Sequence, residues 1–203
     1  MKKKIVMVGG VLLLLIILIS SLSKNSEVQK SFEEGKKQAE QNLEKPAVTY
    51  TLSADAKAIG ISEVEVSGKT NLPDGAVIEI SAVRIFTFLG ETDTRSGLAG
   101  RGFSLTPVSS GKFNVNIKLD DKKFLEDIKI SGEKIQLEPN IGVEVVFNPK
   151  QNQNANVIKA IGENGEFLES SPNKEVFGSK TDNPYNTLEV ELKTPLAFPY
   201  QNP

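Results

Sequence analysis

The pattern of hydrophobic and polar positions divides the chain into three parts, and the first is continuously apolar. Residues 5–23 carry no charge, and residues 11–19 consist only of Val, Leu and Ile. A helix of 19 residues spans roughly 28 Å, because each residue adds about 1.5 Å, and this matches the hydrocarbon core of a bilayer. A helix of a soluble domain normally has a polar face, and this one has none. We therefore predict a membrane-spanning helix within residues 1–23.

Basic residues set the expected orientation of this helix. Lys2, Lys3 and Lys4 precede the apolar run, which favours a cytoplasmic N-terminus and an extracytoplasmic C-terminal domain in a single-pass cell-membrane protein. Two alternatives remain for its processing. The segment is either an uncleaved signal-anchor, which its length favours, or a signal peptide cleaved after Ser23, which would release a secreted domain.

The second part, residues 24–46, is polar and predicts a short helical stalk. Pro46 ends this pattern. We interpret the stalk as a solvated spacer between the membrane and the domain. A short oligomerising helix is the alternative, although Gly35 and the absence of a Leu/Ile heptad argue against a stable coiled coil. The apolar residues recur at roughly helical spacing: Val28, Phe32, Ala39 and Leu43.

The third part, residues 47–203, alternates between apolar and polar positions with period two, as half-buried strands do. Residues 62–68 and 112–119 alternate most regularly. Residues 71–75 predict a tight turn with Pro73 and a glycine. Residues 76–88 predict a long strand whose phase changes near Ala82, which a β-bulge would explain.

Weaker signals complete the prediction for this domain. We expect a single helical turn over residues 120–127 and a short helix within residues 151–161, followed by a turn at residues 162–165. About seven strands at regular spacing predict a mainly β fold, an antiparallel two-sheet immunoglobulin-like sandwich. The remaining strand candidates are residues 103–108, 128–131, 134–137, 141–147 and 188–192.

Composition and charge exclude several classes of function. The chain has no Cys and no His, so it lacks disulfides, thiolate metal sites, cysteine nucleophiles and a Ser-His-Asp triad. Without Lys2–Lys4, 21 basic residues stand against 26 acidic ones. This mildly acidic remainder gives no electrostatic reason to bind nucleic acid. We predict no cofactor and no metal site.

One sequence motif resembles a known group of proteins. Residues 66–75, Val-Ser-Gly-Lys-Thr-Asn-Leu-Pro-Asp-Gly, are followed by a strand, and residues 162–168, Gly-Glu-Asn-Gly-Glu-Phe-Leu, form a second such element. Both resemble elements of exported, membrane-anchored bacterial proteins with an immunoglobulin-like β-sandwich domain of unknown function. The resemblance implies a fold and a location, and it implies no catalytic residue.

Three arginines form the clearest candidate site. Arg84, Arg95 and Arg101 are the only arginines of the chain and fall within 18 positions. Arg95 and Arg101 lie in a glycine-rich segment, residues 90–102, that we expect to be a loop at one end of the sandwich. Arginine captures carboxylates or phosphates in a bidentate manner. We predict Arg95 and Arg101 as ligand-binding residues, with local pairing to acidic neighbours as the alternative.

Other polar groups give weaker candidates. Glu91 with Asp93, and Asp120 with Asp121, lack the spaced oxygen donors of a calcium loop. These carboxylates could also serve as a catalytic pair, but the sequence alone does not say which two acids lie close together in space. The polar run 149–156 could contact glycan or simply be solvated, and the tail 196–203 could bind a partner or pack on the sandwich.

These observations favour a non-enzymatic, membrane-anchored extracytoplasmic binding or accessory module. Its expected partners are the membrane, through the N-terminal helix, and an envelope protein or cell-wall glycan. A structural or assembly protein of the cell envelope is the first alternative. A carboxylate-dependent enzyme acting on glycan is the second.

Overall fold

The computed structural model describes residues 48–181 and 183–200, which belong to the second of the two units of the chain, Ala47–Pro203. The membrane-spanning helix predicted within residues 1–23 and the stalk predicted over residues 24–46 lie outside the described residues. Among the described residues, no helix is both long enough and apolar enough to span a bilayer.

The described domain is mainly β and consists of two antiparallel sheets. One sheet has three strands in the order β1-β2-β5, and the other has five in the order β4-β3-β6-β8-β7. This arrangement agrees with the predicted two-sheet sandwich. The strands are β1 (Leu52–Gly60), β2 (Glu63–Thr70), β3 (Val77–Phe88), β4 (Thr94–Pro107), β5 (Lys112–Lys118), β6 (Ile135–Phe147), β7 (Lys174–Phe177) and β8 (Tyr185–Pro195).

The main hydrophobic core lies between the two sheets. Val64 and Val66 of β2 and Ile78 and Ile80 of β3 are fully buried, because alternate residues of each strand point inward. Leu188 of β8 is also fully buried. The alternation predicted for residues 62–68, 112–119 and 188–192 is therefore confirmed, although β8 extends beyond the predicted strand at both ends.

The change of phase predicted near Ala82 is absent from β3, since Ile80, Ala82 and Arg84 are all buried, and the irregularity near Ala82 is a bulge of the partner strand β4. Ala82 pairs with Gly102 of β4, and Arg84 pairs with Gly97, so residues 98–101 of β4 stand opposite Val83 alone. This extra length makes β4 bulge away from the sheet. Asp120 N donates a hydrogen bond of 2.9 Å to Gly100 O, which fixes the bulge against the start of helix α3 (Asp121–Ser131).

The expectation of a glycine-rich loop over residues 90–102 was wrong for most of that segment. Thr94 already belongs to β4, which continues through the bulge to Pro107. The glycines serve close packing instead. A Cβ atom on Gly102 would lie 2.3 Å from Ile117 Cγ2 of β5, so only glycine allows β4 to approach the other sheet this closely.

The segment after β5 also differs from the prediction. Residues 121–131 form one helix and not a single turn followed by a strand. Asp120 caps it by accepting a 3.0 Å hydrogen bond from Lys123 N, and Gly132 ends it in the left-handed conformation. Phe124 and Ile128, four residues apart on one face, pack on a second small core with Phe86 and Ile135.

The two strands predicted at residues 134–137 and 141–147 are one strand, β6. Its pairing with β3 shifts between Leu137 and Ile141. Pro139 lies in this irregular stretch, where a missing N–H does not interrupt the ladder. The short helix α4 (Ala155–Ile161) and the turn at residues 162–165 are present as predicted. The described strands β1 and β7 have no specific counterpart in the prediction.

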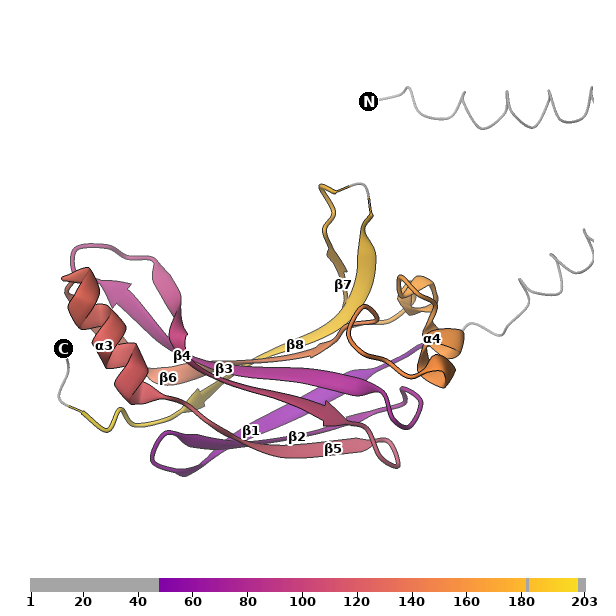
Figure 1. Ribbon diagram of the computed structural model, residues 1–203, viewed down its shortest axis with the longest axis horizontal. Coiled ribbons are helices and arrows are strands. Elements are labelled where there is room, and N and C mark those ends of the chain that lie inside the picture. Colours follow the sequence, from indigo (N-terminus) through magenta and orange to yellow (C-terminus); the bar gives the residue numbers. More distant parts are fainter. Residues whose placement is uncertain (1–47, 182, 201–203) are drawn as a thin grey trace, which may run out of the picture. The chain divides into compact units, whose positions relative to one another are not determined.

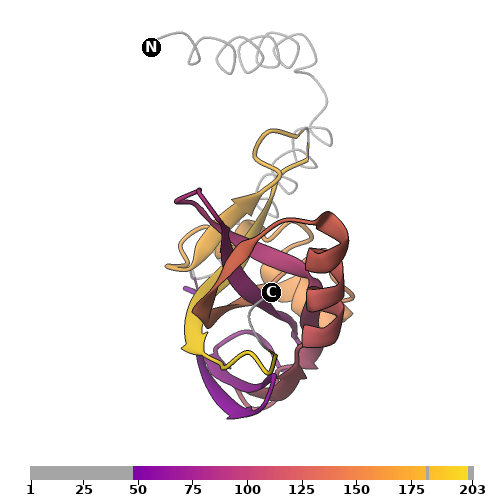
Figure 2. The same cartoon turned by 90° about the vertical axis from the view of Figure 1, so that its left-hand side faces the viewer.

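The outer face of the five-stranded sheet lies open between two raised ends. Figure 1 shows α3 and the β3–β4 turn at one end, and β7 with the start of β8 at the other. The three-stranded sheet covers the opposite side. Figure 2 looks at the α3 end and shows the chain after β8 crossing that end toward the helix.

Candidate functional site

The three arginines occupy three different environments, and Arg84 is buried. It is 2% exposed, and its Nε and Nη2 atoms donate hydrogen bonds of 2.8 and 2.7 Å to the two carboxylate oxygens of Asp121. Arg84 Nη1 and Nη2 also donate to the carbonyl oxygens of Leu196 and Ala197, at 2.6 and 3.0 Å. Such bidentate pairing is the geometry that a planar guanidinium favours.

Asp121 is held equally well. It lies in the first turn of α3, where the helix dipole favours a negative charge, and the Ser62 hydroxyl donates a hydrogen bond to its Oδ2. Ser62 forms the β1–β2 turn with a φ of 60°. The Arg84 guanidinium lies 5.2 Å from the ring centroid of Phe198 in the tail, a cation–π distance.

This network joins β3, the β1–β2 turn, α3 and the tail at one end of the sandwich. Its charged groups are compensated internally, so neither Arg84 nor Asp121 offers an open position to a ligand. Asp120 and Asp121 also do not form a cation site, because Asp120 caps α3 and Asp121 pairs with Arg84. The described part of the tail, to Tyr200, packs on the domain. This agrees with one of the two alternatives that the sequence left open.

Arg95 is exposed and engaged locally. Its Nη2 lies 2.9 Å from Glu91 Oε2, and its guanidinium stacks 5.0 Å from the ring centroid of Phe88. This is the local acidic pairing that the sequence left open as an alternative. An exposed pair of this kind holds the side chain only weakly, so the structure leaves the predicted binding role of Arg95 untested.

Arg101 lies beside a groove on the outer face of the five-stranded sheet. The groove has a volume of about 370 Å³ and is floored by Val83, Gly142 and neighbouring residues of β3 and β6. Arg101 stacks 5.1 Å from the ring centroid of Phe103. Beside it Leu98, at the bulge of β4, is 74% exposed. Arg95 is not among the residues that line the groove.

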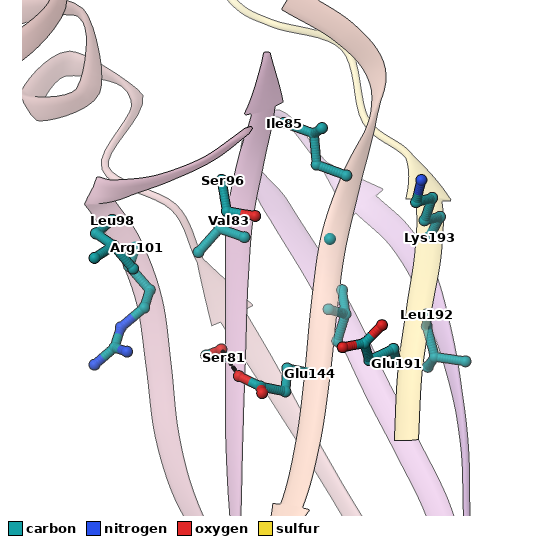
Figure 3. A pocket seen from close by; sticks show the side chains of 12 residues that line it. Ser81, Val83, Ile85, Ser96, Leu98, Arg101, Glu144, Glu191, Leu192 and Lys193 are labelled. Atoms are coloured by element: carbon teal, nitrogen blue, oxygen red, sulfur yellow. Dashed lines mark hydrogen bonds between the residues drawn. The ribbon is translucent and has the colours of Figure 1, made fainter. Parts of the chain in front are cut away.

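Charged side chains border the apolar floor. Figure 3 shows Arg101 on β4 at one side of the groove and Lys193 on β8 at the other, with Glu144 and Glu191 between them. Ser81 Oγ lies 3.4 Å from Glu144 Oε2. Sequence reasoning missed Glu144 and Glu191, because nothing in the sequence alone says that β6 and β8 are neighbours.

The surroundings of Glu144 disfavour its charged form. Partial burial in the groove raises the pKa of the Glu144 carboxyl above its ordinary value, and Glu189, Glu191 and Glu79 raise it further by repulsion, while the Ser81 hydrogen bond opposes the rise. A raised carboxyl pKa in a groove is a feature of functional sites as well as of crowded surfaces.

The polar run 149–156 has mostly internal partners. Gln153 bonds the backbone of Val77 through both its amide oxygen and its amide nitrogen. Asn154 caps α4 by accepting hydrogen bonds from the N–H groups of Asn156 and Val157. These amides anchor α4 to β3, which leaves them little capacity for the glycan contact that the sequence left open.

Comparison with known proteins adds no relative. No protein-family model, no curated protein and no solved structure matches the chain. The groove is therefore interpreted from its own geometry.

Proposed function

We propose that the chain is a non-enzymatic, membrane-anchored extracytoplasmic binding or accessory module that contacts a partner protein through the outer face of its five-stranded sheet. The observation that carries this proposal is the groove beside Arg101. There an apolar floor, two cations and exposed apolar side chains share one open face. Exposed apolar surface rimmed by polar residues is typical of interaction sites.

The membrane anchor and the immunoglobulin-like character are parts of the same proposal. The apolar run of residues 5–23 after three lysines supports an anchor. Three crossings between the sheets, at β2–β3, β4–β5 and β5–β6, support a sandwich of immunoglobulin-like type. A full chain that resists alkaline extraction from membranes, and whose domain is cleaved by protease added outside the cell, would agree. Recovery in the cytosol would refute the anchored topology.

Site-specific photo-cross-linking in intact cells tests the binding face. A photoreactive residue at Leu105, exposed on the outer side of β4, is compared with one at Asn114, exposed on β5 of the other sheet. We expect a discrete product with another protein from position 105 and none from position 114. Products from position 114 alone, or from neither, would contradict the proposal. Self-products alone would favour an assembly protein of the envelope.

A second candidate function rests on Glu144. Its carboxyl has a raised pKa and stands directly opposite Glu191 on the neighbouring strand, as an acid and its partner carboxylate do in enzymes that act on glycan. Hydrolysis of cell-wall glycan by the purified chain, lost in Glu144→Gln and retained in Glu65→Gln on the other sheet, would establish this candidate. No hydrolysis by the wild-type chain would remove it.

A further inference from the structure

The open face of the five-stranded sheet is arranged in two cross-strand rows, each running from apolar to acidic. Phe103 and Leu105 begin the rows on β4, and each is 45% exposed. Glutamates end the rows on β8. The strand register gives the first row as Phe103, Ser81, Glu144 and Glu191, and the second as Leu105, Glu79, Val146 and Glu189.

The four carboxylates of these rows have no cationic partner among the described residues. Hydrogen bonds reach Glu79 from Gln151 at 2.8 Å, and Glu189 from Thr187 at 2.8 Å. None of the four takes part in an ion pair of the described chain. The charges around Glu144 that alter its pKa are all carboxylates. No ion pair among the described residues therefore neutralises the carboxylates of the rows.

Glu144 and Glu191 stand directly opposite each other on adjacent strands. Like charges in this position destabilise a sheet. Local features that destabilise the fold, such as opposed like charges, tend to occur at functional sites. Exposed Phe103, whose ring is also costly to leave in water, lies in the same row, with Ser81 between it and Glu144.

We propose that this face binds a polypeptide segment in which basic side chains lie next to large apolar side chains. The proposal rests on the proposed function and names the chemistry of its partner. Lysines or arginines would lie over the glutamate ends of the rows, and apolar side chains over Phe103 and Leu105. Arg101 and Lys193, at the groove, would receive a carboxylate of the same segment.

Charge complementarity selects this partner over a nucleic acid. A nucleic acid would place phosphates over the same carboxylates. A basic and apolar polypeptide instead reduces the repulsion around Glu144 and covers Phe103 in one contact.

The test uses the full chain in detergent and three fluorescent peptides of equal length and extended design, each of which also carries one photoreactive residue. One peptide alternates Lys with Leu, one alternates Glu with Leu, and one alternates Lys with Ser. We expect tightest binding of the Lys/Leu peptide, weakened by salt. The double variant Glu144→Gln/Glu191→Gln should weaken binding between about twofold and tenfold, as two exposed ion pairs would.

The matched control is Glu63→Gln/Glu65→Gln, which removes two carboxylates from the outer face of the three-stranded sheet. It should leave the affinity unchanged. Equal weakening by both double variants would show nonspecific attraction to an acidic protein and overturn the inference. A Glu/Leu peptide that binds best and cross-links to β4 would overturn the partner chemistry while leaving the binding face in place. If no peptide cross-links to this face and position 105 gives no product in cells, the proposed function fails as well.

Discussion

Two regions of this domain differ in how their charged side chains are paired: the buried network around Arg84 and the outer groove beside Arg101. Arg84 is buried and has two carboxylate oxygens, two carbonyl oxygens and an aromatic ring as partners. Arg101, 17 positions later, stacks on an aromatic ring and forms no ion pair with the described residues, and it lies beside a groove whose carboxylates also form none. The comparison teaches that equal residue types close in sequence can divide between holding a fold together and facing outward.

The largest expected effect concerns the buried network of Arg84 and Asp121, called here the sealed network. Asp121→Asn should lower the free energy of unfolding by about 3–5 kcal/mol, because it leaves the Arg84 charge buried without its counter-ion. Chemical denaturation of the full chain measures this. The control Asp127→Asn, on the exposed side of the same helix, should leave stability nearly unchanged. Similar losses in both variants would mean that the network is not special.

The next effect concerns the link between the sealed network and the open face. Gly100 has a φ of +69°, and a Cβ atom there would lie 2.2 Å from Asp120 O. Gly100→Ala should cost more than the roughly 1–2 kcal/mol of left-handed strain. Gly90 has a φ of +97°, and an added Cβ there would lie more than 4 Å from every described residue except its chain neighbours, so Gly90→Ala should cost the strain alone. Equal midpoints in thermal unfolding would contradict a clamped bulge.

A smaller effect of opposite sign is expected on the open face. Glu144→Gln should raise stability at neutral pH by about 0.5 kcal/mol, because it removes a like charge opposite Glu191. The folded-state pKa of Glu144 is raised, so the folded state binds the proton more tightly than the unfolded state. Wild-type stability from this group therefore falls as pH rises from the ordinary carboxyl pKa, about 4.3, through the folded value.

This pH dependence checks the assignment. The advantage of Glu144→Gln should vanish below about pH 4, where the carboxyl is protonated in both states. Unfolding curves from pH 3 to 8 compare the variant with the wild type. An advantage that is constant over this range would place its origin in packing and not in charge.

The smallest effect on stability should accompany a large loss of binding. Leu98→Ser/Phe103→Ser changes exposed side chains, so the free energy of unfolding should stay within about 0.5 kcal/mol, while cross-linking from position 105 is lost. Ile61→Ser, at a 77% exposed position in the β1–β2 turn, should change neither property. If the double variant still cross-linked from position 105, the exposed apolar side chains beside the groove would not be needed for binding.

The local sequence pattern was enough to predict the alternating strands. It was not enough to predict which side chains from different strands and helices contact one another. The period-two alternation around Val64 and Phe113 predicted β2 and β5 correctly, because one face of each strand is buried. The pairing of Arg84 with Asp121 was out of reach, since it depends on the place of α3. Ile128 to Ser131 looked like a strand because helix capping by Asp120 and Gly132 is a weaker signal than alternation.

The candidate site was predicted in part for the same reason. Arg101 was singled out by its residue type and by its place in a glycine-rich segment expected to be a loop; most of that segment is strand β4, and the structure places Arg101 beside a groove. Arg95 was singled out equally and lies outside that groove. Glu144 and Glu191 are 47 positions apart in the sequence, and only the register of β6 with β8 brings them together.

Carboxyl footprinting in native membranes shows whether the outer face of the five-stranded sheet is covered by a partner, and it needs no knowledge of that partner. Glutamates are labelled with a water-soluble carbodiimide and a small amine, in intact membranes and in the purified full chain. We expect Glu144 and Glu191 to be protected in membranes relative to the purified chain, while Glu63 and Glu65 on the other sheet react alike in both. Equal reactivity of all four in the two preparations, or protection of Glu63 and Glu65 alone, would contradict the assignment of the binding face.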